Sequence, residues 1–137
     1  MARSEKTIHV QDGENSLKVI IKPMSAVKAE RWMLKAGMAV GGSALTLGRD
    51  SVAEDIAKAL SQVDYEKVAP LWDELLLCCQ LDHDGVITDL TPETIEGKID
   101  YPTTLFIIKV AAIQANFGFF GNGGFAKFLT AMRGVLT

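Results

Sequence analysis

The sequence predicts a mainly α-helical protein, a single domain over residues 1–137 with a minor β part, and three observations support this. Residues 6–22 hold two alternating stretches around a turn sequence, and four later stretches repeat apolar residues at helical spacing. The chain has 137 residues, about the size of one domain. Because an isolated hairpin is only marginally stable, we expect the N-terminal hairpin to pack on a helix bundle.

The N-terminal hairpin is expected over residues 6–22, where KTIHV and SLKVII alternate apolar and polar residues on either side of QDGEN. Pro23 ends the second strand because it has no N–H for a sheet hydrogen bond. Ser25 then serves as the N-cap of a helix over residues 25–41. This helix has one apolar stripe, made of Ala29, Trp32, Met33, Ala36 and Val40.

Three further helices are predicted. The helix over residues 51–63 begins with the capping-box spacing of Ser51 and Glu54, and the helix over residues 65–80 follows Asp64 as N-cap. The stripe of the latter consists of Val68, Trp72, Leu75, Leu76 and Cys79. The helix over residues 102–117 is apolar on nearly every side, which predicts the central helix of the bundle. Between these two we expect a turn, a short extended piece at 86–88 and a short helix opening at Thr91.

Residues 118–137 form a C-terminal segment rich in phenylalanine and glycine. Phenylalanine has a large apolar side chain, whereas glycine has the most flexible backbone of any residue. Its rings either fold back and fill a groove of the domain, or stay partly exposed and bind another protein. The partner-binding residues predicted from this pattern are Phe117, Phe119, Phe120, Phe125 and Phe128.

Catalytic chemistry has weak support in the sequence. Asp82, His83 and Asp84 include metal-ligand types, but contiguous residues seldom point at one centre, and Asp84-Gly85 is a common turn sequence. We interpret them as a solvated turn. Cys78 and Cys79 are adjacent, so they rarely bridge, and we interpret them as buried structural thiols of a reduced, cytoplasmic protein. The glycines match no dinucleotide or phosphate-binding pattern.

Net charge and hydropathy limit the classes of partner that the protein is expected to bind. The formal net charge of −3 gives no basic footprint for nucleic acid or an anionic membrane, and the longest apolar run is broken by Lys109, Gln114 and Asn116. The acidic residues Glu66, Asp73 and Glu74 of the third helix form a solvated face, with docking of a basic partner as the alternative. The sequence therefore predicts no catalytic, cofactor or metal residue.

Two stretches resemble the small tail assembly chaperones of long-tailed bacteriophages and prophages. They are IKPMSAVKAERWMLKAG after the hairpin, and PLWDELLLCC followed by LTPETIEGKIDYPTTLFIIKVAAIQANFGFF. The resemblance runs from about Lys6 to Phe120. The marked positions are Pro23, Met24, Trp32, Leu75, Leu76, Cys79, Asn116 and Phe120.

The resemblance implies a non-enzymatic protein that binds the tape measure protein, prevents its aggregation and helps to recruit tail tube protein subunits. It also implies self-association, a place in the cytoplasm of the bacterial host and absence from the mature virion, with this chain as the shorter of two frameshift products. It supplies no catalytic residue or cofactor. Two alternatives stay open, a minor structural tail protein and a small metal-dependent enzyme that uses Asp82, His83 and Asp84.

Overall fold

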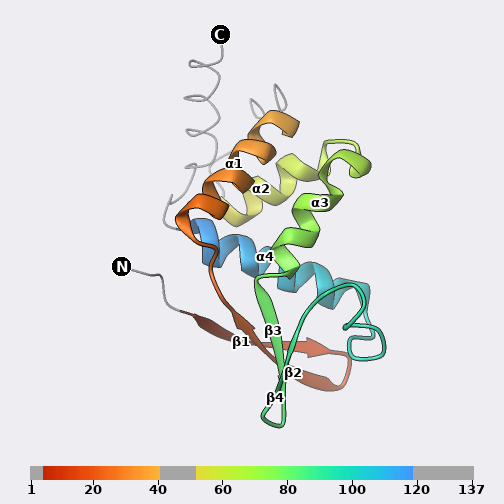
Figure 1. Cartoon of the computed structure of the whole chain (residues 1–137). Helices are drawn as coiled ribbons and strands as arrows, with labels where there is room; N and C mark the ends of the chain where they lie inside the picture. The colour runs from red at the N-terminus through yellow and green to blue at the C-terminus, as the bar shows by residue number, and fades with distance from the viewer. Residues whose placement is uncertain (1–4, 41–51, 119–137) are drawn as a thin grey trace.

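A four-stranded antiparallel sheet and four helices make up the described part of the chain, and the helices lie on one face of the sheet (Figure 1). The computed structural model describes residues 5–40 and 52–118. The strands follow the order β1-β2-β3-β4 in the sheet, with bounds Lys6–Asp12, Asn15–Ile21, Cys79–His83 and Val86–Asp89. The helices are α1 (Ala26–Val40), α2 (Val52–Ser61), α3 (Tyr65–Leu76) and α4 (Pro102–Phe117).

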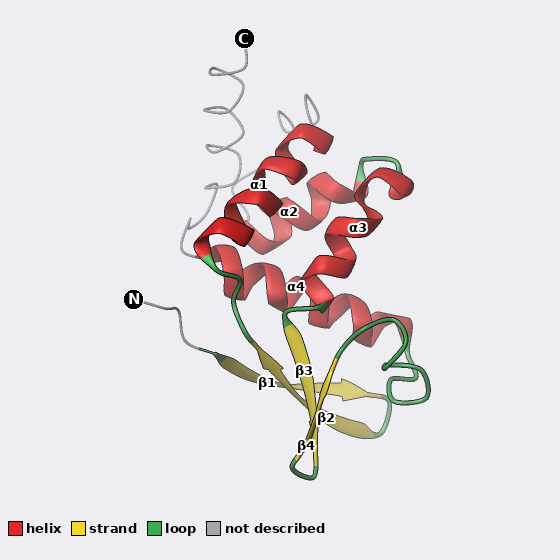
Figure 2. Ribbon diagram, viewed as in Figure 1, coloured by secondary structure: helices red, strands yellow, loops and turns green. Residues whose placement is uncertain are grey.

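The prediction of a mainly α-helical fold is wrong, because the protein belongs to the α+β class. A second hairpin, β3–β4, extends the first and doubles the sheet (Figure 2). The third helix, predicted to reach residue 80, ends at Leu76, and Cys79 already pairs with Ile21 of β2. The extended piece expected at 86–88 is part of β4, while the short helix expected at Thr91 is replaced by a series of turns.

Both hairpins turn through two residues. Gly13 follows Asp12 with a φ of 66°, and a Cβ atom there would lie 2.7 Å from the ring of Tyr101, so both backbone and space require glycine. In the second hairpin Asp84 and Gly85 have φ values of 51° and 87°, the two positive values of a type I′ turn. Positive φ at the first turn residue, Gly13, and at both residues of the second turn lets each turn follow the twist of its strands.

The inner face of the sheet forms one side of the core. Val10 of β1, Val19 and Ile21 of β2, and Leu81 of β3 are buried, and their sequence neighbours point to the other face. On that other face Lys18 of β2 pairs with Asp82 of β3, with 3.4 Å between Nζ and Oδ2. This alternation gives the sheet one face for the helices and one for solvent.

Helix α4 lies between the sheet and the other three helices (Figure 1). It contacts β1 and β2 on one side and α2 and α3 on the other. Its residues Thr104, Ile108, Ala112, Ile113, Asn116 and Phe117 are buried. A helix covered on two sides needs apolar residues on most of its surface, which is why its sequence shows no clear polar face.

Candidate protein-binding surface

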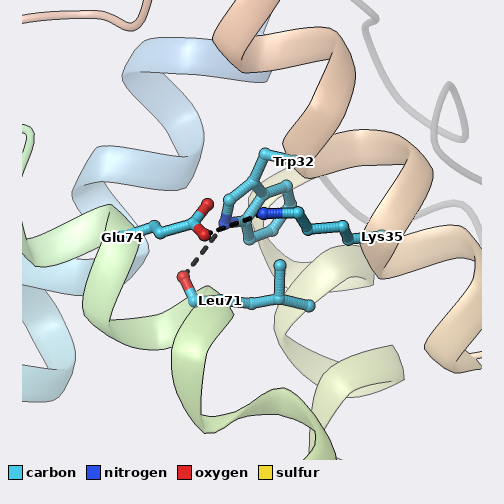
Figure 3. Close-up of polar contacts among 4 residues, drawn as sticks. All are labelled: Trp32, Lys35, Leu71 and Glu74. Carbon is cyan, nitrogen blue, oxygen red and sulfur yellow. Dashed lines mark hydrogen bonds and ion pairs between the residues drawn. The ribbon is translucent and has the colours of Figure 1, made fainter.

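Helices α1 and α3 are joined by one buried and one exposed polar contact (Figure 3). The indole N–H of Trp32 donates to the carbonyl oxygen of Leu71 at 3.0 Å inside the core. One turn further along each helix, Lys35 Nζ lies 3.1 Å from Glu74 Oε1 near the surface. The buried bond fixes the orientation of the Trp32 ring, because an indole N–H left without an acceptor in the core is costly.

The structure places Phe117 in the core. Its ring stacks on Trp32 with 5.1 Å between centroids, and its exposed fraction is 1%. We therefore leave Phe117 out of the partner-binding residues proposed below. Phe119, Phe120, Phe125 and Phe128 lie outside the described residues, so their partner-binding role stays a prediction from the sequence.

The hydrogen bonds of Asn116 account for its presence among the positions that mark the resemblance. Its side-chain oxygen accepts the backbone N–H of Met24 at 2.7 Å, and its amide nitrogen donates to the carbonyl oxygen of Ala112 at 2.8 Å. The side chain is fully buried. Asn116 thus holds the segment that leads from β2 into α1 against the end of α4.

An apolar groove of about 450 Å³ lies among α2, α3 and α4. Trp72 of α3 and Phe106 of α4 meet in it, with ring centroids 5.7 Å apart and planes inclined by 46°. We call this surface the apolar groove; its other lining residues are Leu60, Ser61, Val63, Tyr65, Val68, Pro102, Leu105 and Lys109. Two polar side chains, Ser61 and Lys109, accompany an otherwise apolar or aromatic set, which is the composition of a protein-docking site.

Helix α4 leaves two large apolar side chains partly in water beside this groove. Phe106 is 53% exposed and Ile107 is 51% exposed, although they belong to the helix that lies between the sheet and the other helices. Tyr65, which lines the same groove, is also exposed. Burial of such side chains against a partner would remove apolar surface from water and so favour association.

The three residues considered for a metal form part of the β3–β4 turn. Asp82 Oδ1 accepts the backbone N–H of Gly85 at 3.0 Å, and Asp82 Oδ2 pairs with Lys18. His83 and Asp84 are highly exposed, and His83 Nε2 lies 3.6 Å from Asp84 Oδ2. No group of three or more histidine, cysteine or acidic side chains suited to a metal occurs within residues 5–40 and 52–118.

Cys78 and Cys79 are buried thiols where α3 passes into β3. Burial, together with the adjacent Cys78, raises the pKa of the Cys79 thiol to about 12. Its Sγ donates to the carbonyl oxygen of Leu75 at 3.7 Å. A buried, protonated thiol is a poor nucleophile, which supports the structural interpretation of this pair.

The acidic residues suggested as one face of α3 have different surroundings, because one of them forms an ion pair with α1. Glu66 and Asp73 are exposed, whereas Glu74 is half-buried and holds Lys35. Sequence reasoning correctly treated Trp72 as a core residue, because its side chain is buried, but it missed the apolar groove because it looked for partners in the C-terminal segment. The available signal was that residues 102–117 are apolar on nearly every side, so that any part of this helix left uncovered, as at Phe106 and Ile107, exposes apolar side chains.

Comparison with known proteins identifies the class. A family model described as "Phage tail assembly chaperone protein, TAC" matches residues 15–126, which cover β2, the β3–β4 hairpin and all four helices. No curated protein and no solved structure matches the chain. The chain belongs to this phage tail assembly chaperone family, which confirms the resemblance seen in the sequence.

Family membership gives the general role. The family is one of assembly proteins rather than enzymes, and its partners are proteins of the phage tail. None of the helices formed by the described residues is long and apolar enough to cross a membrane.

Proposed function

We propose that the protein is a tail assembly chaperone that binds the tape measure protein, prevents its aggregation and helps to recruit tail tube subunits. The match to the family over residues 15–126 is the observation that carries this proposal. The apolar groove among α2, α3 and α4 supports it, because a client that exposes apolar helices requires a surface of this kind.

The client would dock as an amphipathic helix. Phe106 and Tyr65 offer exposed aromatic surface, and Trp72 forms the wall behind Phe106. Rigid aromatic side chains contribute much of the energy of protein interfaces and lose little conformational entropy on binding. Lys109 at the same groove can hold an acidic residue on the polar side of the client helix.

One such groove gives modest affinity, so we propose that several copies act together along the client. Self-association would bring the grooves into a series, and binding at one site would then raise the effective concentration at the next. We assign this self-association, or a second client contact, to Phe119, Phe120, Phe125 and Phe128, on the pattern of the sequence alone.

Co-purification tests client binding. We expect tagged tape measure fragments expressed with the protein to retain it, and Phe106→Ser to reduce retention roughly tenfold by removing a half-exposed aromatic anchor. Val86→Ser is the matched control, because Val86 is a similarly exposed apolar residue at the tip of the β3–β4 hairpin. Equal retention of wild type and Phe106→Ser would contradict docking in the apolar groove.

Two measurements separate a chaperone from a virion component. Light scattering over a concentration series should show oligomers, and replacement of Phe119 and Phe120 by serine should reduce them without unfolding the protein. Mass spectrometry of purified particles should not detect the protein, because we place it in the host cytoplasm during assembly. Its recovery from finished virions in stoichiometric amounts would favour a minor structural tail protein.

A further inference from the structure

A second groove, of about 640 Å³, opens beside α1 and differs from the first in its chemistry. Four basic residues line it, Lys22, Lys28, Arg31 and Lys35, together with two acidic residues, Glu74 and Asp89. We call it the basic groove. The whole chain carries a formal charge of −3, so an excess of positive charge at one concave surface runs against the average of the molecule.

Most of the charges in the basic groove have partners among the described residues, but two cations have no ion-pair partner among them. Lys35 pairs with Glu74 (Figure 3), Lys22 lies 3.8 Å from Glu5, and Asp89 accepts a hydrogen bond from Gln80 at 2.7 Å. Lys28 and Arg31 are exposed, and neither makes an ion pair with another residue of the described ranges. Lying three residues apart on α1, they are neighbours on its surface.

The groove also offers apolar surface beside these cations. Leu77 is 60% exposed, and Pro23 and Met24 are half-buried. A nucleic acid fits this combination poorly, because the described residues that line the groove include no aromatic ring for base stacking. A peptide that alternates carboxylates with apolar side chains fits both parts.

We infer that the basic groove binds an acidic, amphipathic segment of a protein partner. Carboxylates of the segment pair with Lys28 and Arg31, the latter in the two-bond geometry of a guanidinium, and an apolar side chain covers Leu77. The chaperone thereby has two sites of different chemistry, so that one partner can occupy the apolar groove while an acidic segment occupies the basic one. This inference does not depend on the identity of the client in the apolar groove.

Fluorescence anisotropy on the full chain tests the inference, with a short labelled peptide of glutamate and leucine as the probe. We expect saturable binding that weakens as salt is added, and much weaker binding of the same peptide with glutamine in place of glutamate. The double variant Lys28→Glu with Arg31→Glu should weaken binding roughly tenfold, as expected when two exposed ion pairs become repulsive.

The matched control is Lys6→Glu with Lys67→Glu, which changes the net charge equally at exposed sites outside the groove. Phe106→Ser should leave binding of the acidic peptide unchanged, which keeps this test separate from the proposed client site. If charge reversal unfolds α1 by circular dichroism, Lys28→Gln with Arg31→Gln replaces it, with a smaller loss expected.

Three outcomes would overturn the inference. They are absence of saturable binding, equal binding of the glutamine peptide, and equal loss in the Lys6 and Lys67 control. Tighter binding of a single-stranded oligonucleotide or an anionic vesicle than of the peptide, lost in the Lys28 and Arg31 variant, would assign the groove to a different class of partner.

Discussion

Asp12 joins the sheet to the central helix. It is the last residue of β1, and its buried carboxylate accepts the backbone N–H groups of Asp100 and Tyr101, at 2.8 and 3.1 Å, and the hydroxyl of Thr104 at 2.9 Å. Tyr101 is the N-cap residue of α4, and its own side chain makes no capping bond. A carboxylate from β1 therefore supplies the cap that the local sequence lacks.

This arrangement makes part of the stability dependent on pH. Burial by itself would raise the pKa of Asp12, but the bonds from Asp100, Thr104 and Tyr101 outweigh burial and hold the pKa below its ordinary value of 3.8. A carboxyl whose pKa is lower in the folded state stabilises the protein above the pKa of the unfolded chain. That contribution is lost as the pH falls through the lower, folded value.

We expect Asp12→Asn to reduce the free energy of unfolding by roughly 1–3 kcal/mol at neutral pH, because hydrogen bonds to a buried carboxylate are lost or weakened. Urea denaturation at a series of pH values measures this, and the difference from wild type should shrink below about pH 4. Glu14→Gln, an exposed change in the same hairpin, is the control and should have little effect. A difference from wild type that stays constant across this range would contradict the role of the charge.

Among the elements, the β3–β4 hairpin is the one that changes the fold class. Its first strand continues directly from α3: the N–H of Cys78 donates to the carbonyl oxygen of Leu75 at 3.1 Å, and Cys79 is already in the sheet. The N–H of Lys22 donates to the carbonyl oxygen of Cys78 at 2.8 Å and closes the junction with β2. The helix therefore ends where pairing with β2 begins to satisfy the backbone.

The type I′ turn of this hairpin depends on Gly85. A Cβ atom at Gly85 would contact no atom within 4 Å, so a substitution there costs only backbone conformational energy. We expect Gly85→Ala to destabilise the protein by about 1 kcal/mol and to lower the midpoint of thermal unfolding by about 3–5 °C. Asp84→Asn should be near neutral because asparagine also adopts positive φ. Two unchanged midpoints would show that the turn is not strained by alanine.

For the molecule as a whole, α4 couples the sheet to the helices. Because it packs against β1 and β2 as well as α2 and α3, neither part keeps a complete core without it. We therefore expect far-ultraviolet circular dichroism and the fluorescence of Trp32 and Trp72 to report the same unfolding transition.

Two adjacent residues of α4 test this coupling. Ile108 is fully buried and Ile107 is 51% exposed. We expect Ile108→Ala to cost about 2–5 kcal/mol and to shift both spectroscopic transitions together. Ile107→Ala should change the free energy of unfolding by no more than about 0.5 kcal/mol. Separate transitions in the Ile108 variant would show that sheet and helices unfold independently.

The element types that rest on local patterns were predictable. The first hairpin, the starts of α1 and α4 and the apolar stripe of Trp32 and Met33 follow from alternation, helical spacing and proline position. The Ser25 cap is observed, since the N–H of Lys28 donates to Ser25 Oγ at 3.3 Å. The family too was recognisable, because the marked residues are spread along most of the chain.

Other features depend on contacts between distant residues. Cys79 fits the helical stripe of α3 and the alternation of β3 equally well, and only pairing with Ile21 decides between them. Likewise, Phe117 and Phe106 are both apolar residues of α4, yet one stacks on Trp32 in the core and the other lines a groove. By itself the sequence determined local periodicity, the Ser25 cap and the family, because these follow from the residues along the chain, whereas Asp64 makes no side-chain capping bond and the cap of α4 comes from Asp12. Tertiary structure alone decided the fold class and which surface is exposed, because both depend on which segments distant in the sequence pack against a residue.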